Sequence, residues 1–145
     1  FNDNISESQV WDSIDQVGAR RFIEALPNKL NFNVKERGAS LSVGQRQLIS
    51  CIRIMLYDPK IILLDEATSS VDSETESMIQ SAISKILKNR TSIVVAHRLS
   101  TIKEVDNIIV LENGEIKEIG DHNSLNKSGG YYRRLYEMQN KNILT

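Results

Sequence analysis

Apolar residues at helical spacing predict three helices in the part of the chain before Pro59. The first has one apolar face, which Gly18 can close at its C-terminal end: Val10, Trp11, Ile14 and Val17. The second is short, carries Phe22, Ile23 and Leu26, and stops before Pro27. A loop then runs from Asn28 to Ser40. The third helix ends at Asp58-Pro59, and its buried positions are Leu48, Cys51, Ile52, Met55 and Leu56.

The period of the apolar pattern changes after Lys60. Ile61 to Leu64 are all apolar, as expected of a strand that is buried on both faces of a parallel sheet. A helix follows, begun by a Ser73-x-x-Glu76 capping box and ended by Asn89. Its apolar stripe consists of Met78, Ile79, Ala82, Ile83, Ile86 and Leu87. Ser92 to Ala96 predicts a second buried strand, so residues 60–97 are interpreted as one β-α-β unit.

The rest of the chain predicts an antiparallel hairpin and a closing helix. The hairpin strands are Ile108 to Leu111 and Ile116 to Ile119, joined by the turn Asn113-Gly114. Tyr131 to about Lys141 forms the helix. Buried strands that alternate with helices indicate an α/β fold class.

Composition narrows the class of protein. A chain of 145 residues with 40% hydrophobic and 26% charged residues is ordinary for one globular domain, which excludes collagen-like, disordered and disulfide-scaffold proteins. The formal net charge is −1 and no basic stripe is present, so a nucleic acid partner is not indicated. The single cysteine, Cys51, is expected to be a buried thiol. No apolar run is long enough to span a bilayer, and the chain begins at Phe1 without a secretory signal, as expected of a piece of a longer protein.

Candidate chemistry lies at the carboxyl ends of the two predicted strands. Asp65 and Glu66 directly follow the first strand, and His97 follows the second. In open α/β sheets, ligands bind beyond these ends. One carboxylate can hold a hard cation such as Mg²⁺ with waters retained, the other can accept a proton or orient a water, and the histidine can bind a phosphoryl oxygen.

A second candidate site is the start of the third helix. Ser42 and Gln45 form a Ser-x-x-Gln capping box. Gly44 lowers the stability of the first turn, but it clears the approach to backbone N–H groups at the positive end of the helix dipole. Such a terminus can bind phosphate.

Taken together, these segments resemble ATP-binding cassette (ABC) ATPases. Leu41 to Gln47 resembles the signature sequence, Ile61 to Glu66 the Walker B strand and Ser69 to Asp72 the D-loop, while His97 falls at the H-loop histidine. Val43 departs from the commonest signature pattern, which has a second glycine there. Three further segments are similar to exporter-type cassettes: Glu36 to Gly38, His97 to Ile102 and Gly120 to His122.

The resemblance implies a partial P-loop NTPase-type ABC ATPase domain. Residues 1–58 are expected to form a helical subdomain ending in the signature helix. Residues 59–145 would form the C-terminal part of the parallel-sheet catalytic core, with Walker B, D-loop, H-loop and closing helix. The sequence contains no G-x-x-x-x-G-K-[ST] phosphate loop, so Walker A and the Q-loop are expected upstream of Phe1.

The resemblance also implies roles for individual residues in a head-to-tail dimer. Four signature residues are expected to contact ATP bound by the partner subunit: Ser42, Val43, Gly44 and Gln45. Asp65 would hold Mg²⁺ through water, Glu66 would be the general base, and His97 would contact the γ-phosphate. Asp72 would couple the two sites through the D-loop.

The expected function is ATP hydrolysis coupled to export, with ATP and Mg²⁺ as ligands. The expected partners are a second nucleotide-binding domain, in a homodimer or a heterodimer, and a transmembrane domain, which places this domain on the cytoplasmic face of the cell membrane. Without Walker A, the chain alone is expected to be inactive. Two alternatives stay open at this point: a soluble ABC-type ATPase of DNA repair or chromosome organisation, and a regulatory module that does not hydrolyse ATP.

Overall fold

A computed structural model describes residues 5–65, 71–96 and 99–142. The chain forms two compact units, Phe1–Val94 and Val95–Thr145. The expected subdomain boundary between residues 58 and 59 lies inside the first unit and stays a prediction. Among the described residues, every helix is too short or too polar to cross a membrane.

The first unit contains the predicted helices and strands. In chain order they are α1 (Glu7–Val17), α2 (Arg20–Ala25), α3 (Val43–Tyr57), β1 (Ile61–Asp65), α4 (Ser73–Leu87) and β2 (Thr91–Val95). Gly18 closes α1 in the left-handed conformation, as predicted, with a φ of 81°. The predicted loop between α2 and α3 contains two short 3-10 turns, Lys29–Asn31 and Glu36–Gly38.

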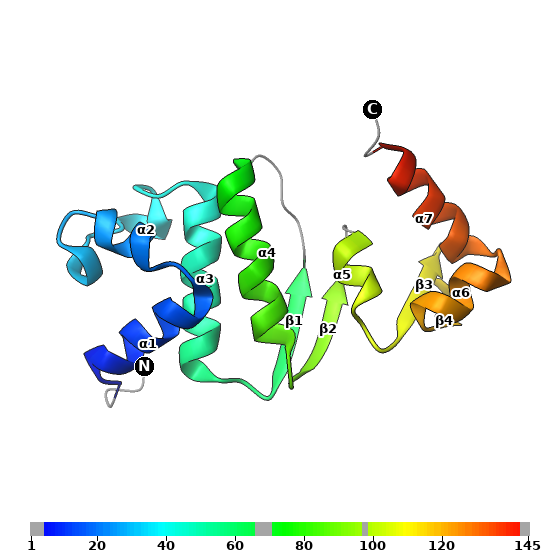
Figure 1. The fold of residues 1–145 in the computed structure, drawn as a ribbon, viewed down its shortest axis with the longest axis horizontal. Helices are drawn as coiled ribbons and strands as arrows, with labels where there is room; N and C mark the ends of the chain where they lie inside the picture. The colour runs from blue at the N-terminus through cyan, green and yellow to red at the C-terminus, as the bar shows by residue number, and fades with distance from the viewer. Residues whose placement is uncertain (1–4, 66–70, 97–98, 143–145) are drawn as a thin grey trace. The chain divides into compact units, whose positions relative to one another are not determined.

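The core of this unit lies among α1, α3 and α4, and Figure 1 shows α3 and α4 side by side. Ile14 of α1 and Leu48 of α3 are its most completely enclosed large side chains. The other buried members are Val17, Ala19, Ile23, Cys51, Ile52, Ile62, Ile79, Ala82, Ile83 and Ile86. Burial raises the pKa of the Cys51 thiol to about 11, so this thiol is protonated at neutral pH, as expected of a packing residue.

The sheet differs from the expectation that both strands are buried on both faces. β1 and β2 pair as parallel neighbours (Figure 1). Ile62 is 4% exposed and joins the helical core, but Ile61 and Leu63 are 64% and 76% exposed. Ile93 and Val95 of β2 are likewise more than half exposed. Successive strand side chains point to opposite faces, and the helices of this unit enclose only one of them.

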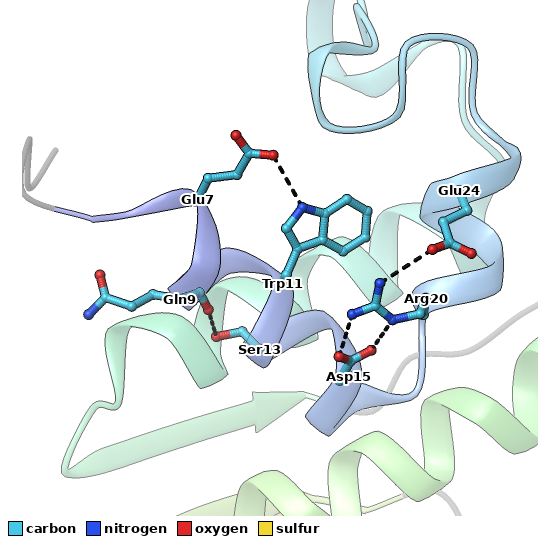
Figure 2. A network of polar contacts seen from close by, with 7 residues as sticks. All are labelled: Glu7, Gln9, Trp11, Ser13, Asp15, Arg20 and Glu24. Carbon is cyan, nitrogen blue, oxygen red and sulfur yellow. Dashed lines mark hydrogen bonds and ion pairs between the residues drawn. The ribbon is translucent and has the colours of Figure 1, made fainter.

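A polar network joins α1 to α2 (Figure 2). The Arg20 guanidinium donates two hydrogen bonds to the Asp15 carboxylate and a third to Glu24. It also lies over the Trp11 ring, 4.9 Å from the centroid, and the indole N–H donates to Glu7. The hydrogen bonds that Arg20 donates to Asp15 lower the pKa of this carboxyl group. Arg20, although exposed, therefore connects α1 to α2.

The second unit contains α5 (Leu99–Lys103), β3 (Ile108–Glu112), β4 (Glu115–Gly120), α6 (His122–Ser128) and α7 (Tyr131–Asn142). The predicted hairpin is confirmed: β3 and β4 are antiparallel, and Asn113 and Gly114 both have positive φ, as its tight turn requires. The closing helix is also confirmed, whereas the sequence pattern did not predict α5 or α6. Val110, Leu125 and Tyr132 form the core of this unit.

The start of α7 depends on a carboxylate from β4. Glu118 Oε2 accepts a hydrogen bond of 2.7 Å from the backbone N–H of Tyr132. A Cβ at Gly130 would collide with the Glu118 carboxylate, so glycine lets this carboxylate stay where it is. The Tyr132 hydroxyl is 2.6 Å from His122 Nδ1, and burial raises the pKa of this tyrosine. The hairpin, α6 and α7 therefore form one packed module.

Helix α4 begins one residue earlier than the predicted Ser73 capping box. The N-cap is Asp72, whose Oδ1 accepts a 2.9 Å hydrogen bond from the backbone N–H of Thr75, and Ser73 is already the first helical residue. A charged carboxylate is a stronger acceptor than a hydroxyl at the positive end of the helix dipole, which favours a start one residue earlier than the Ser73 box. The backbone hydrogen bond lowers the pKa of Asp72.

Replacing Asp72 by Asn makes stability less dependent on pH. Because the folded pKa lies below the ordinary value of 3.8, the charge of Asp72 stabilises the fold above 3.8, and this contribution is lost as the pH falls through the folded pKa. Asn keeps the accepting oxygen without the charge. In thermal denaturation the wild type should therefore melt above Asp72→Asn at pH 7, and the difference should shrink as the pH falls below 3.8 and through the folded pKa. Asp72→Ala, which lacks the acceptor, should stay below both; a difference between wild type and Asn that does not vary with pH would contradict this role for the charge.

Candidate functional site

The N-terminus of α3 has the geometry that the sequence predicts. Ser42 Oγ accepts from the backbone N–H of Gln45 at 3.2 Å, and Gln45 Oε1 accepts from the backbone N–H of Ser42 at 3.0 Å. The reciprocal capping box is therefore confirmed. Ser42 and Val43 are exposed, so the side chains at the tip of the helix are accessible from outside the unit.

Gly44 is buried one position further along, and its contacts explain why it is glycine. A Cβ there would lie 2.6 Å from Cγ2 of Thr75 and 2.8 Å from Cγ1 of Val71. Both distances are too short for any real side-chain atom, so the first turn of α3 touches the start of α4 with no room to spare. The sequence predicts a different role for Gly44, access to the backbone N–H groups. Its packing on Val71 and Thr75 has no sequence signal, because no period of the chain links residues 44 and 75.

This contact brings two predicted motifs together. Val71 and Thr75 enclose Gly44. Asp72, at the end of the predicted D-loop, lies between these two residues in the sequence. Its carboxylate caps α4, so the same helix start that receives the signature glycine is fixed by the D-loop aspartate. Any displacement of the start of α4 would therefore press directly on the first turn of α3.

The predicted carboxylate site is described in part. Asp65 is the last residue of β1, and its side chain is exposed. Glu66 and His97, together with Ser69 and Ser70 of the predicted D-loop, lie outside the described residues. β1 and β2 run in the same direction, so the carboxyl ends of both strands lie at the same edge of the sheet (Figure 1).

The described residues contain no group of three or more His, Cys, Asp or Glu side chains able to enclose a metal ion. An exposed carboxylate at a strand end nevertheless fits Mg²⁺, which is commonly held by one or two carboxylates together with substrate phosphates and waters. Asp65 is therefore a chemically suitable ligand for such an ion.

The structure also identifies a residue that sequence reasoning missed. Arg46 Nη1 donates a 2.6 Å hydrogen bond to the backbone carbonyl of Leu41, on the loop that precedes α3. The stem of the same side chain lies against Gly38. An exposed arginine near the start of a helix gives no sequence signal that it folds back onto the preceding loop.

Comparison with known proteins places this geometry in a family. A family model described as ABC transporter matches residues 2–69. The chain is 44% identical, over 95% of its length, to a probable multidrug resistance ABC transporter ATP-binding/permease protein of Bacillus subtilis, of which it covers 20%. It is 46% identical, over 93% of its length, to an ATP-dependent lipid A-core flippase of Shewanella oneidensis, of which it covers 22%. It is also similar to the solved structure of a bacterial Atm1-family ABC exporter with ATP bound, with a TM-score of 0.80 and 36% identity over 95% of this chain and 24% of that one.

The fold is thus that of an ABC ATPase fragment, with helices packed on a parallel pair of strands. The chain belongs to the ABC transporter family, and the resemblance inferred from Leu41 to Gln47 and Ile61 to Glu66 is confirmed. The chain spans about a fifth of the length of these curated relatives.

Adding a methyl group at Gly44 should destabilise the protein even without nucleotide. Alanine is the better helix former, by roughly 0.5–1 kcal/mol, but its Cβ would collide with Thr75 and Val71. We expect Gly44→Ala to lower the midpoint of urea unfolding of the nucleotide-free protein. Thr75→Ser removes the methyl group at 2.6 Å, so the double variant should recover part of the loss. Wild-type stability of Gly44→Ala would show that the packing at this position is dispensable.

Proposed function

We propose that this chain is the C-terminal part of the ATP-binding and hydrolysing domain of an ABC-type exporter. The observation that carries the proposal is the start of α3, where the Ser42–Gln45 capping box leaves the helix tip exposed and Gly44 seats the first turn against α4. The matched relatives are named as transporters that combine ATP binding with a permease, or as a flippase driven by ATP.

The N-terminus of α3 is suited to an anion. Backbone N–H groups of the first turn point out of the helix, and the helix dipole adds partial positive charge there. In the proposed dimer, four residues of this terminus contact the γ-phosphate of ATP held by the partner subunit: Ser42, Val43, Gly44 and Gln45. The Val43 side chain is 43% exposed at the tip, so it borders the nucleotide where the commonest signature has glycine.

Hydrolysis is assigned to the residues that follow the two strands. Asp65 holds Mg²⁺ through water, and this ion neutralises charge on the phosphate oxygens when bound. Glu66 acts as general base or orients the attacking water, and His97 binds the γ-phosphate. Asp72 couples the two sites of the dimer, supported by its position beside the contact of Gly44 with α4.

The proposed partners are a second nucleotide-binding domain, identical or different, and a transmembrane domain of the same transporter. The domain would lie on the cytoplasmic face of the cell membrane, and ATP-driven closure of the dimer followed by hydrolysis would drive export. The alternative of a DNA repair or chromosome ATPase has no support among the relatives described above, and no nucleic acid partner is proposed.

Glu66→Gln in the full-length protein should bind ATP and hardly hydrolyse it. The amide keeps the shape of the side chain but cannot accept a proton from water, so kcat should fall by about two orders of magnitude or more. ATP binding by equilibrium titration and phosphate release are the measurements. Glu74→Gln, which removes an exposed carboxylate in the first turn of α4, is the matched control and should leave turnover unchanged. Unchanged steady-state hydrolysis in Glu66→Gln would remove Glu66 from the catalytic role.

The 145-residue chain by itself should release phosphate from ATP only at the background rate. It carries no sequence able to form a Walker A phosphate loop, so half of each composite site is missing. The comparison is phosphate release by the chain and by the full-length protein at equal concentration with Mg²⁺. Robust hydrolysis by the chain alone would overturn the idea that a phosphate loop outside it is required.

A further inference from the structure

Helix α5 directly follows the part of the chain to which the γ-phosphate contact is assigned. It spans Leu99–Lys103 and begins two residues after His97. Two peptide units reach at most about 7 Å, so the chain itself keeps the Cα atom of His97 within that distance of the Cα atom of Leu99. The contacts that fix the position of α5 therefore limit where the His97 side chain can act.

A helix as short as α5 does not hold a position by itself. Its five residues make little more than one turn. Isolated helices of fewer than about 12 residues are marginal in water, because the first turn costs more conformational entropy than its few hydrogen bonds return. α5 must therefore take its place from contacts with other elements of the second unit.

These contacts come from the core of the second unit and from α7. Thr101 is 8% exposed, and Ile102 packs against the buried cluster that contains Tyr132 of α7. Lys103 is exposed, but its Nζ lies 5.4 Å from the centroid of the Tyr136 ring, the geometry of a cation–π contact. α5 is thus attached to α7 both in the core and at the surface.

The Tyr136 ring is itself fixed by its neighbours. It stacks on Tyr132, with 6.0 Å between the ring centroids and 27° between the ring planes, and the His122 ring lies 5.2 Å away. Tyr132 is fixed in turn, because its backbone N–H donates to Glu118 and its hydroxyl is 2.6 Å from His122 Nδ1. Lys103 therefore meets a ring that belongs to a packed aromatic cluster.

We propose that Tyr136 is a positioning residue for His97. Tyr136 contacts Lys103 and packs on the same core as Ile102, so it holds α5 and, through the chain, the residue that precedes it by two positions. The proposal rests on the function proposed above, in which His97 binds the γ-phosphate of ATP. Phosphoryl transfer depends mainly on accurate placement of such groups, so a displaced α5 slows the chemical step and leaves ATP binding by other residues intact.

The test measures steady-state ATP hydrolysis by the full-length protein carrying Tyr136→Leu. Leucine keeps an apolar side chain against the core but offers no ring to the Lys103 ammonium. We expect kcat to fall by about threefold to tenfold, with the KM for ATP within about twofold of wild type. Tyr136→Phe keeps the ring and should retain most of the rate. Wild-type kcat in Tyr136→Leu, or a Phe variant as slow as the Leu variant, would overturn the role of the ring.

Two further variants separate positioning from a general weakening of α7. Tyr131→Leu makes the same substitution at the first residue of that helix, where the side chain is 40% exposed, and should leave kcat unchanged. An equal loss of rate in this control would contradict a specific role for Tyr136. If Tyr136→Leu does not fold, Lys103→Met decides, because it alters an exposed side chain: a lower kcat at unchanged KM supports the proposal, and a wild-type kcat overturns it.

His97→Ala separates this inference from the function on which it rests. A wild-type kcat in that variant would contradict the proposed γ-phosphate contact itself. Once the histidine is absent, nothing remains for Tyr136 to position, so adding Tyr136→Leu should leave residual phosphate release, measured with protein in excess of ATP, the same within about twofold. A further threefold fall or more in the double variant would show that Tyr136 acts by another route.

Discussion

The contact between the first turn of α3 and the start of α4 is the feature on which the rest of the site depends. Because Gly44 has no side chain, Thr75 and Val71 can pack against the first turn of α3. Further along the two helices, Leu48 of α3 and Ile79 of α4 belong to the same apolar core. Because packed interiors do not deform continuously, this contact fixes where the signature residues lie relative to the start of α4.

Polar N-cap side chains then decide where α1, α3, α4 and α6 begin. Ser6, Ser42, Asp72 and Asp121 all accept hydrogen bonds from backbone N–H groups in the first turn of the helix that follows them. In the second unit, Glu118 supplies the same acceptor to α7 from a neighbouring strand. These bonds satisfy groups that a helix cannot satisfy itself, and they set each helix start to within one residue. In the proposed ATPase site, which is built from loop and helix termini, that accuracy places the chemistry.

Much of the fold could be predicted from the sequence, because it depends on local periodicity. The stripe that contains Leu48 and Cys51 is buried as the spacing of residues in α3 required, and Asn113-Gly114 makes the predicted turn. The capping box at Ser42 was visible because both its partners lie within four residues. Asp72 was missed as a cap because a Ser-x-x-Glu pattern starts one residue later.

Contacts between distant residues could not be predicted in the same way. The enclosure of Gly44 by Thr75, and the packing of Arg46 on Gly38, depend on how α4 and the loop before α3 pack in three dimensions. The burial of β1 on both faces was predicted from the continuous apolar run Ile61 to Leu64, but such a run does not reveal how many faces of the strand are covered. Only the alternating exposure in the structure shows that one face is enclosed.

That half-enclosed strand pair has a practical consequence for handling the chain in isolation. Ile61, Leu63, Ile93 and Val95 place four large apolar side chains on one side of a short parallel pair. Soluble monomers seldom expose such a surface, because it attracts other strands and apolar surfaces in concentrated solution. The same side chains do not contribute to the helical core around Ile14 and Leu48. Polar replacements on this side can therefore suppress aggregation without loosening the packing that seats the signature helix.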